Sequence, residues 1–346
     1  MRIVITGATG FLGRHTARQL AGTGHSLLCL SRSGTLPAGL PPTDTVQSAS
    51  VDVMDEAALD AAFDGQDVLV HAAGVVSHSL ADAARTTALH ITGTDRAMRA
   101  ARRAGIKRVI YLSTSGTIAV GTDPNQVFDE DAPPPLDIID RWPYYRSKLF
   151  AEQIALKHND ADLPVICLNP SLLLGPGDDP LGKSTEAVRT FLDDGVPLAP
   201  PGGIAFVDVR DVADAIERAL TRGTPGQRYL LNGCNQTFEA FFARLGRLSG
   251  KAAPMGALPG RATREALRWL PGLGRDGGIG IGVGARISRE DMELASHTWS
   301  CDSSRAQKAL GWNPRDPLET LRDTIADLRS HQGSVFDAFA TFSAGR

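Results

Sequence analysis

The feature that most constrains the fold is a regular alternation of short β-rich runs and helical patterns through the first half of the chain. The runs are nearly continuous in apolar residues, as in parallel strands that are buried on both faces. This alternation predicts an α/β fold built on a doubly wound parallel sheet. The strand-like runs lie at 2–6, 26–31, 45–53, 67–72, 108–113 and 164–169, and the helical patterns lie at 12–21, 56–63, 81–104 and 144–157.

The pattern changes after residue 169, where a segment rich in proline and glycine at 170–182 predicts a loop. The segment 271–286 is dense in glycine and is interpreted as a surface loop, with a flap over a substrate pocket as the alternative. The remaining predicted elements are helices at 184–194, 211–221 and 237–249, strands at 204–209 and 228–232, and two helices within 302–329.

These changes predict two domains. We expect a first domain over residues 1–169, to which parts of 204–232 return. A smaller C-terminal α/β substrate domain is expected mainly over 170–330, and residues 331–346 form a weakly patterned tail.

Composition narrows the class of protein. The 346 residues are 42% apolar and 22% charged with a net charge of −3, so we expect no nucleic-acid partner and no anionic lipid surface. No apolar run is long enough to span a bilayer, and the first residues predict a strand rather than a signal peptide. The four cysteines are far apart and predict neither a disulfide framework nor a metal site, which fits a cytoplasmic protein.

The segment "TGATGFLG" (6–13) follows the first strand and opens the first helix. Gly7 allows a sharp turn, Gly10 lets a pyrophosphate approach the backbone, and Gly13 allows close packing of helix and sheet. The free N–H groups of the helix N-terminus would face the phosphates. This segment therefore predicts a dinucleotide site, with an ordinary strand–helix turn as the alternative.

With the preceding Thr6, the Gly-x-x-Gly-x-x-Gly spacing resembles the short-chain dehydrogenase/reductase superfamily. The length and second half resemble its extended branch, the epimerase/dehydratase group, over about residues 1–329. The resemblance implies a Rossmann domain in which Asp52 reaches the adenine and Val53 packs near it. Further cofactor contacts implied by the resemblance are Thr9, Phe11 and Leu12 in the glycine turn, Ala72 and Ala73 in "HAAG", and Pro170, Ser171 and Leu172.

Arg32 follows the second strand, at the position that faces the adenosine ribose in such folds. A carboxylate there suits a 2′-hydroxyl, whereas a guanidinium suits a 2′-phosphate. NADP(H) is therefore predicted in preference to NAD(H), with a solvated surface arginine as the alternative reading of Arg32.

The segment "YYRSK" places Tyr144 and Lys148 four residues apart, on one face of a predicted helix. A nearby ammonium is expected to lower the phenol pKa toward the range of a useful proton carrier. The resemblance implies a third partner, a hydroxyl at the end of the strand at 108–113. Thr114 is favoured for this catalytic position, and Ser115 is the alternative.

The absence of certain arginines indicates which class of substrate the chain binds. The segment 198–209 has no arginine of the kind that holds a sugar diphosphate in nucleotide-sugar relatives, and Asn169 stands where many relatives have arginine. Val76, His78 and Ser115 are candidate substrate contacts, although a lone histidine such as His78 is more often structural. The closest resemblance is to dihydroflavonol-reductase-like and 3β-hydroxysteroid-dehydrogenase-like members.

The sequence therefore predicts an NAD(P)H-dependent oxidoreductase that reduces a ketone or aldehyde, or oxidises the alcohol, of a bulky apolar molecule. The alternatives are a sugar epimerase or dehydratase with tightly held cofactor and a non-enzymatic, NmrA-like dinucleotide sensor. The resemblance also implies a homodimer formed through the helices at 81–104 and 144–157.

Overall fold

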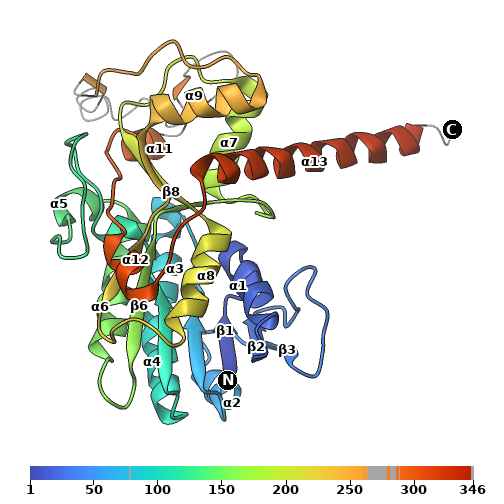
Figure 1. Ribbon diagram of the computed structural model, residues 1–346, viewed down its shortest axis with the longest axis vertical. Helices are drawn as coiled ribbons and strands as arrows, with labels where there is room; N and C mark the ends of the chain where they lie inside the picture. Colours follow the sequence, from blue (N-terminus) through green and yellow to red (C-terminus); the bar gives the residue numbers. More distant parts are fainter. Residues whose placement is uncertain (78, 261, 264–278, 281–285, 288, 344–346) are drawn as a thin grey trace.

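A seven-stranded parallel sheet forms the larger layer of the computed structural model (Figure 1). The structure describes residues 1–77, 79–260, 262–263, 279–280, 286–287 and 289–343. The strand order is β3-β2-β1-β4-β5-β6-β9, so the chain winds outward in both directions from β1 and the predicted doubly wound sheet is confirmed. The strands are β1 (Arg2–Thr6), β2 (Ser26–Ser31), β3 (Val46–Ser50), β4 (Val68–His71), β5 (Arg108–Leu112), β6 (Val165–Pro170) and β9 (Arg228–Leu231).

Helices cover both faces of this sheet. Successive side chains of a strand point to opposite faces, so Ile3 and Ile5 join one core while Val4 joins the other. The first core lies under α1 (Phe11–Ala21), α8 (Val209–Ala219) and α12 (Ser304–Leu310), and the second under α2 (Glu56–Phe63), α4 (Gly93–Arg103) and α6 (Pro143–Lys157). Burial on both faces explains why the strands read as continuous apolar runs.

A smaller mixed sheet of order β10-β8-β7 forms the second layer. Its elements are β7 (Leu172–Leu174), β8 (Gly203–Asp208) and β10 (Cys234–Thr237), packed with α7 (Lys183–Asp194), α9 (Phe238–Ser249) and α13 (Pro317–Ser343). The prediction of a plain loop at 170–182 is therefore wrong, because β7 begins two residues after β6 ends. β7 and β10 are too short to give a clear periodic pattern.

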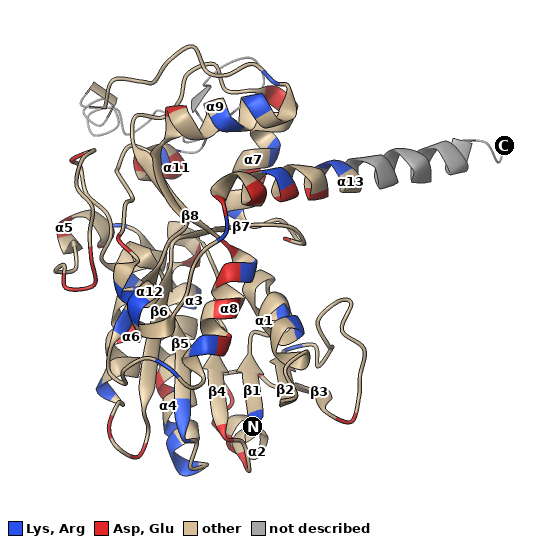
Figure 2. Ribbon diagram, in the orientation of Figure 1, with Lys and Arg blue, Asp and Glu red and all other residues tan. Residues whose placement is uncertain are grey.

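Ion pairs connect the two layers. Arg210 on α8 contacts Asp323 on α13 at 2.7 Å, and Arg315 contacts Asp211 at 2.9 Å. Both acidic and basic residues lie on α8 and on α13 in Figure 2. The backbone of α13 continues through the weakly patterned segment as far as Ser343, and its end projects away from the rest of the molecule (Figure 1).

The helical pattern predicted over 81–104 is confirmed in extent, but the stretch is not a uniform α-helix. This stretch is η1 (Leu80–Asp82), α3 (Ala83–Thr87), the π-helical turn η2 (Ala88–Thr92) and then α4. Gly93, where α4 begins, lies so close to the sheet that a Cβ there would be 3.2 Å from Val53 Cγ2. His90 lies in this wider π-helical turn, and its side chain is buried.

Short elements complete the described chain: η3 (Ser115–Thr117), α5 (Leu136–Ile139), β11 (Ile279–Gly280), β12 (Arg286–Ile287) and α11 (Arg289–Leu294). Most of the predicted loop or flap at 271–286 lies outside the described residues. All four cysteines are free. Among the helices that the structure describes, none combines the length and apolar character that crossing a bilayer requires.

Candidate active site

The glycine turn joins β1 to α1 at the carboxyl edge of the large sheet. Gly7 has a φ of +71°, and a Cβ there would lie 2.7 Å from the carbonyl oxygen of Ala72. A Cβ on Gly13 would lie 2.1 Å from the carbonyl oxygen of Gly7, so the helix could not pack this closely with any other residue. A Cβ on Gly10 would meet only the Gly7 carbonyl oxygen, at 3.3 Å, so the space at the helix N-terminus is open.

The N-terminus of α1 is suited to an anion. Among the described residues, no side chain caps the helix at Gly10. Phe11 packs its ring 5.6 Å from that of His15, and Leu12 packs on the core. Because both residues lie in the first turn of α1, their backbone N–H groups have no acceptor within the helix. Arg14 holds the turn by donating to the carbonyl oxygens of Thr9 and Gly177 at 3.2 and 3.1 Å. The residues fit the pyrophosphate of a dinucleotide.

The predicted adenosine residues lie along the same edge. Arg32 is exposed in the turn directly after β2, where its carbonyl oxygen accepts from Ser50 Oγ at 2.9 Å. Asp52 is exposed and accepts from the N–H of Met54 at 2.9 Å, while Val53 is buried. Asp55, rather than Asp52, caps α2. The carboxylate of Asp52 thus stays at the surface beside the turn.

The loop after β4 lies beside the glycine turn. The N–H of Ala72 donates to the Thr6 carbonyl oxygen at 3.2 Å, and that of Ala73 donates to Thr6 Oγ1 at 3.3 Å. Val76 further along is 56% exposed, so it is available to a ligand. His78 lies outside the described residues.

Tyr144 and Thr114 are brought together by the packing of α6 against the end of β5. The hydroxyl of Thr114 lies close enough to the phenol of Tyr144 to lower its pKa, and it also accepts from the N–H of Gly116 at 3.3 Å. Ser115, the alternative hydroxyl, is buried at the start of η3. The contact favours Thr114 over Ser115 as the partner of Tyr144.

Lys148 lies one helical turn beyond Tyr144 and is buried. Its ammonium donates to the Leu112 carbonyl oxygen at 2.5 Å and lies 5.0 Å from the centre of the Tyr111 ring. Burial lowers the pKa of Lys148 from 10.5 to about 8.

The expectation that the pKa of Tyr144 is lowered is wrong for the protein without a dinucleotide. Burial raises the pKa of Tyr144 to about 12, and the hydrogen bond from Thr114 offsets only part of that rise. The sequence showed that Lys148 lies on the same helix face but not how far the phenol is removed from water. This desolvation has the largest effect on the pKa of Tyr144.

A buried polar network lies behind Thr114. Oε2 of Glu152 accepts from Ser113 Oγ at 2.5 Å, from Thr117 Oγ1 at 3.1 Å and from Asn169 Nδ2 at 2.7 Å. Its other oxygen lies 3.4 Å from Nε of Arg228. The side chain of Asn169, where relatives carry arginine, therefore belongs to this network, and the guanidinium next to Glu152 comes from β9 instead.

The link between the two sheets begins at the end of β6. Asn169 Nδ2 also donates to the Thr114 carbonyl oxygen at 3.1 Å. Pro170 is buried, Ser171 Oγ donates to Asn232 Oδ1 at 3.0 Å, and Leu172 opens β7. Asn169 thus ties the end of β6 to the residues after β5, and the contacts of Pro170, Ser171 and Leu172 with the cofactor stay a prediction.

Aromatic rings that the sequence analysis missed extend from Tyr144. The Tyr145 ring centre lies 5.0 Å from that of Tyr144 and 4.8 Å from that of Trp299. A Cβ on Gly116 would be 2.3 Å from Tyr145, so only glycine leaves room for the Tyr145 ring. Trp299 is far away in sequence, so only the tertiary fold reveals this contact.

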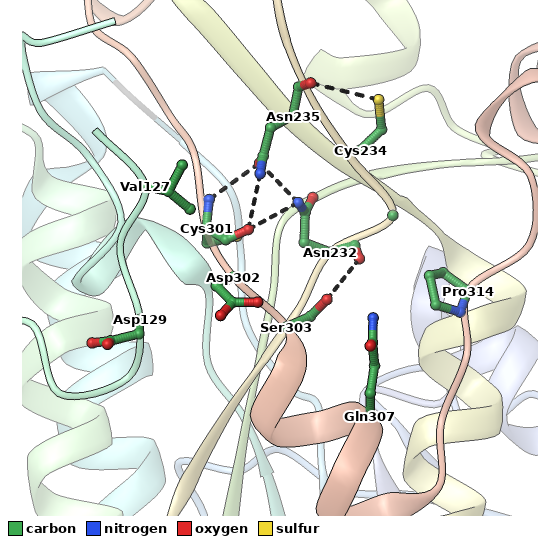
Figure 3. Close-up of a pocket in the computed structure, with 11 residues that line it drawn as sticks. Val127, Asp129, Asn232, Cys234, Asn235, Cys301, Asp302, Ser303, Gln307 and Pro314 are labelled. Carbon is green, nitrogen blue, oxygen red and sulfur yellow. Dashed lines mark hydrogen bonds between the residues drawn. The ribbon is translucent and has the colours of Figure 1, made fainter. Parts of the chain in front are cut away.

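A surface pocket of about 440 Å³ lies between the β9–β10 connection and the start of α12 (Figure 3). Its amide side chains hold one another and the backbone. Asn232 Nδ2 donates to Asn235 Oδ1 at 2.8 Å, and Asn235 Nδ2 donates to the Cys301 carbonyl oxygen at 3.0 Å. Its link to the candidate active site is the hydrogen bond between Asn232 and Ser171.

Several known proteins are similar to this chain along nearly its whole length. A protein of Synechocystis sp. named for dihydroflavonol 4-reductase is 28% identical over 345 residues, covering 94% of each chain. Sterol demethylase protein B of Methylococcus capsulatus is 28% identical, covering 95% of this chain and 98% of its own. The 3 beta-hydroxysteroid dehydrogenase/Delta 5-->4-isomerase of Mycobacterium tuberculosis is 25% identical over 354 residues, covering 97% of this chain and 91% of its own.

Solved structures share the fold. The crystal structure of gox2253 has a TM-score of 0.81 and 29% identity, covering 95% of this chain and 98% of that one. The dTDP-glucose 4,6-dehydratase DesIV of Streptomyces venezuelae has a TM-score of 0.75 at 21% identity, covering 96% of this chain and 98% of its own.

The model of the NAD dependent epimerase/dehydratase family matches residues 3–231, which span the glycine turn, Thr114, Tyr144 and Lys148. The chain therefore belongs to this family, the extended branch of the short-chain dehydrogenases/reductases, and is an oxidoreductase that uses an NAD(P) dinucleotide.

Proposed function

We propose that this enzyme reduces a ketone or aldehyde on a bulky, largely apolar molecule with NADPH, or oxidises the corresponding alcohol. The observation that carries the proposal is the placement of Tyr144 within reach of Thr114 at the carboxyl edge of the sheet, with Lys148 on the same helix face and buried beside it. A bound nicotinamide dinucleotide would supply or accept the hydride.

Each of these side chains has a separate task. Tyr144 gives a proton to the carbonyl oxygen or takes it from the alcohol. Thr114 hydrogen-bonds the same oxygen and shares the charge that develops on it. Lys148 holds the ribose beside the nicotinamide and, when protonated, favours the phenolate of Tyr144.

Two observations support an apolar substrate. The rings of Tyr145 and Trp299 extend from Tyr144, and the exposed Val76 lies on the loop after β4. The relatives named above include proteins whose names refer to a flavonol and to steroids, and a ketoreductase of Stigmatella aurantiaca acts on a farnesyl quinoline oxide according to its name.

The preference for NADPH rests on Arg32, whose guanidinium follows β2 and whose neighbours at that strand end are serines rather than carboxylates. We also propose a homodimer through the paired helices α4 and α6. Phe150 on α6 is 39% exposed, and a partner subunit packed on this helix would cover it.

The test is a screen of ring ketones, steroid ketones, β-keto acids and nucleotide sugars for oxidation of added NADPH. Turnover with a ring or steroid ketone supports the proposal. Conversion of a nucleotide sugar by enzyme that retains its nucleotide through purification would favour an epimerase or dehydratase, and binding of NADPH with no turnover of any of them would favour a sensor.

A further inference from the structure

His90 is a buried histidine that touches both the loop after β4 and the helix that carries Tyr144. It lies in η2, the π-helical turn. Such turns occur often at functional sites because the wider turn redirects a side chain. The His90 ring meets that of Tyr144 edge-on, with 5.7 Å between the ring centres.

Both ring nitrogens of His90 are hydrogen-bonded. The backbone N–H of Val75 lies 3.2 Å from Nε2, and Ser147 Oγ lies 2.8 Å from Nδ1. Because a backbone N–H can only donate, Nε2 is the acceptor, and the proton of the neutral ring is on Nδ1 and points to Ser147. The Ser147 hydroxyl in turn donates to the Tyr144 carbonyl oxygen at 2.9 Å.

The surroundings keep this ring neutral. Burial, with smaller contributions from the nearby Lys148 and His71, lowers the pKa of His90 to about 3. A Cβ on Gly74 would lie 3.1 Å from Nε2, so glycine lets the loop come close enough for the Val75 hydrogen bond. A charged imidazolium would put a proton on Nε2 and break that bond.

We propose that His90 is a positioning residue which, through Val75 and Ser147, fixes Tyr144 relative to the cofactor-binding loop at 72–77. The inference rests on the proposed function, because proton transfer requires the phenol to stand at a set position beside the nicotinamide. A misplacement of about 1 Å at such a site costs on the order of a hundredfold in rate.

Three substitutions separate the contacts. His90→Asn keeps a donor near Nδ1 for Ser147 but loses the acceptor for Val75, and His90→Gln does the reverse. His90→Phe keeps the ring edge against Tyr144 without either hydrogen bond. Because the connection needs both bonds, all three should lower kcat by roughly ten- to a hundredfold, while the KM of the carbonyl substrate stays within about threefold of its original value. His331→Phe, on the exposed part of α13, is the matched control and should leave kcat unchanged.

Coupling between His90 and Ser147 gives the decisive kinetic result. If both act through one connection, the kcat losses of His90→Phe and Ser147→Ala should not multiply in the double variant. Multiplied losses, or full kcat in either His90→Asn or His90→Gln, would overturn the proposal.

A second readout is independent of turnover. Nitrogen-15 NMR of labelled histidine in the wild-type chain should show a protonated Nδ1 and an unprotonated Nε2 for His90 from pH 5 to 8. The opposite tautomer, or titration of His90 within this range, would also overturn the proposal. A wild-type enzyme that turns over no carbonyl compound would instead count against the proposed function itself.

Discussion

Thr114 lies within reach of the phenol of Tyr144 across the junction between helix α6 and the end of strand β5, and it lowers the pKa of that phenol. Asn169 and Thr117 both bond the Thr114 carbonyl oxygen, at 3.1 and 2.9 Å, so the residue that meets the phenol is itself held from behind. Hydrogen bonds at the carboxyl edge of the sheet therefore fix Thr114, whereas helix α6 supplies Tyr144.

Thr114→Val should lower kcat by roughly ten- to a hundredfold, because a hydrogen bond to developing charge is lost while the side-chain volume is kept. The pH optimum should move little, since no charge is removed. Ser115→Ala is the matched control and should retain most activity, as measured by NADPH oxidation across pH. A larger loss from Ser115→Ala than from Thr114→Val would make Ser115 the catalytic hydroxyl.

Arg32→Asp should exchange the cofactor preference. A charge-assisted hydrogen bond contributes about 1.5–3 kcal/mol, so the Kd of NADPH should rise by roughly ten- to a hundredfold while that of NADH falls or holds. Lys107→Asp makes the same charge change at the opposite edge of the sheet and should alter neither value. Nucleotide fluorescence titrations measure both, and equal affinities of the wild-type chain for NADPH and NADH would contradict the assignment.

The Lys148 pKa makes a prediction about stability. Its pKa is about 8 in the folded chain against 10.5 unfolded, so the unfolded state binds more protons between these values and the free energy of unfolding rises with pH there. Lys148→Met removes this dependence. Urea denaturation of both proteins from pH 7 to 10 should show the wild type gaining stability relative to Lys148→Met, and parallel curves would refute the shifted pKa.

Glu152 should matter to the fold as much as to the site. Glu152→Leu leaves the hydroxyl of Ser113 without an acceptor and the guanidinium of Arg228 without its carboxylate, while Thr117 and Asn169 keep the Thr114 carbonyl oxygen. Removing one member of a buried ion pair typically costs about 3–5 kcal/mol, which urea denaturation would detect. Glu152→Leu combined with Arg228→Leu should recover part of the loss, and a loss under about 1 kcal/mol for Glu152→Leu alone would show that the network contributes little.

The sequence predicted those features that depend on local pattern. The strands of the large sheet, the glycine turn and the pairing of Tyr144 with Lys148 follow from apolar runs and residue spacing within one element. The spacing of Glu152, four residues after Lys148, was equally visible. Its role was not, because its partners come from β5, β6 and β9 and meet only in the folded chain.

Two misses have physical causes. A helical period of 3.6 residues cannot reveal the π-helical turn at Ala88–Thr92, so the burial of His90 could not be predicted from the sequence. The direction of the Tyr144 pKa depends on burial, which sums over many distant neighbours. The spacing of Tyr144 and Lys148 alone predicted a lowered pKa, whereas the pKa is raised.

The most direct test of the account is Tyr144→Phe, which removes the proton carrier and leaves the ring packing nearly unchanged. NADPH binding, measured separately by fluorescence, should hardly move, because the glycine turn and Arg32 are untouched. Turnover of the carbonyl substrate found by the screen should fall by roughly a hundredfold or more, the usual range for loss of a general acid–base. If Tyr144→Phe binds NADPH normally and keeps most of its activity, the proton comes from another group and the proposed mechanism is wrong.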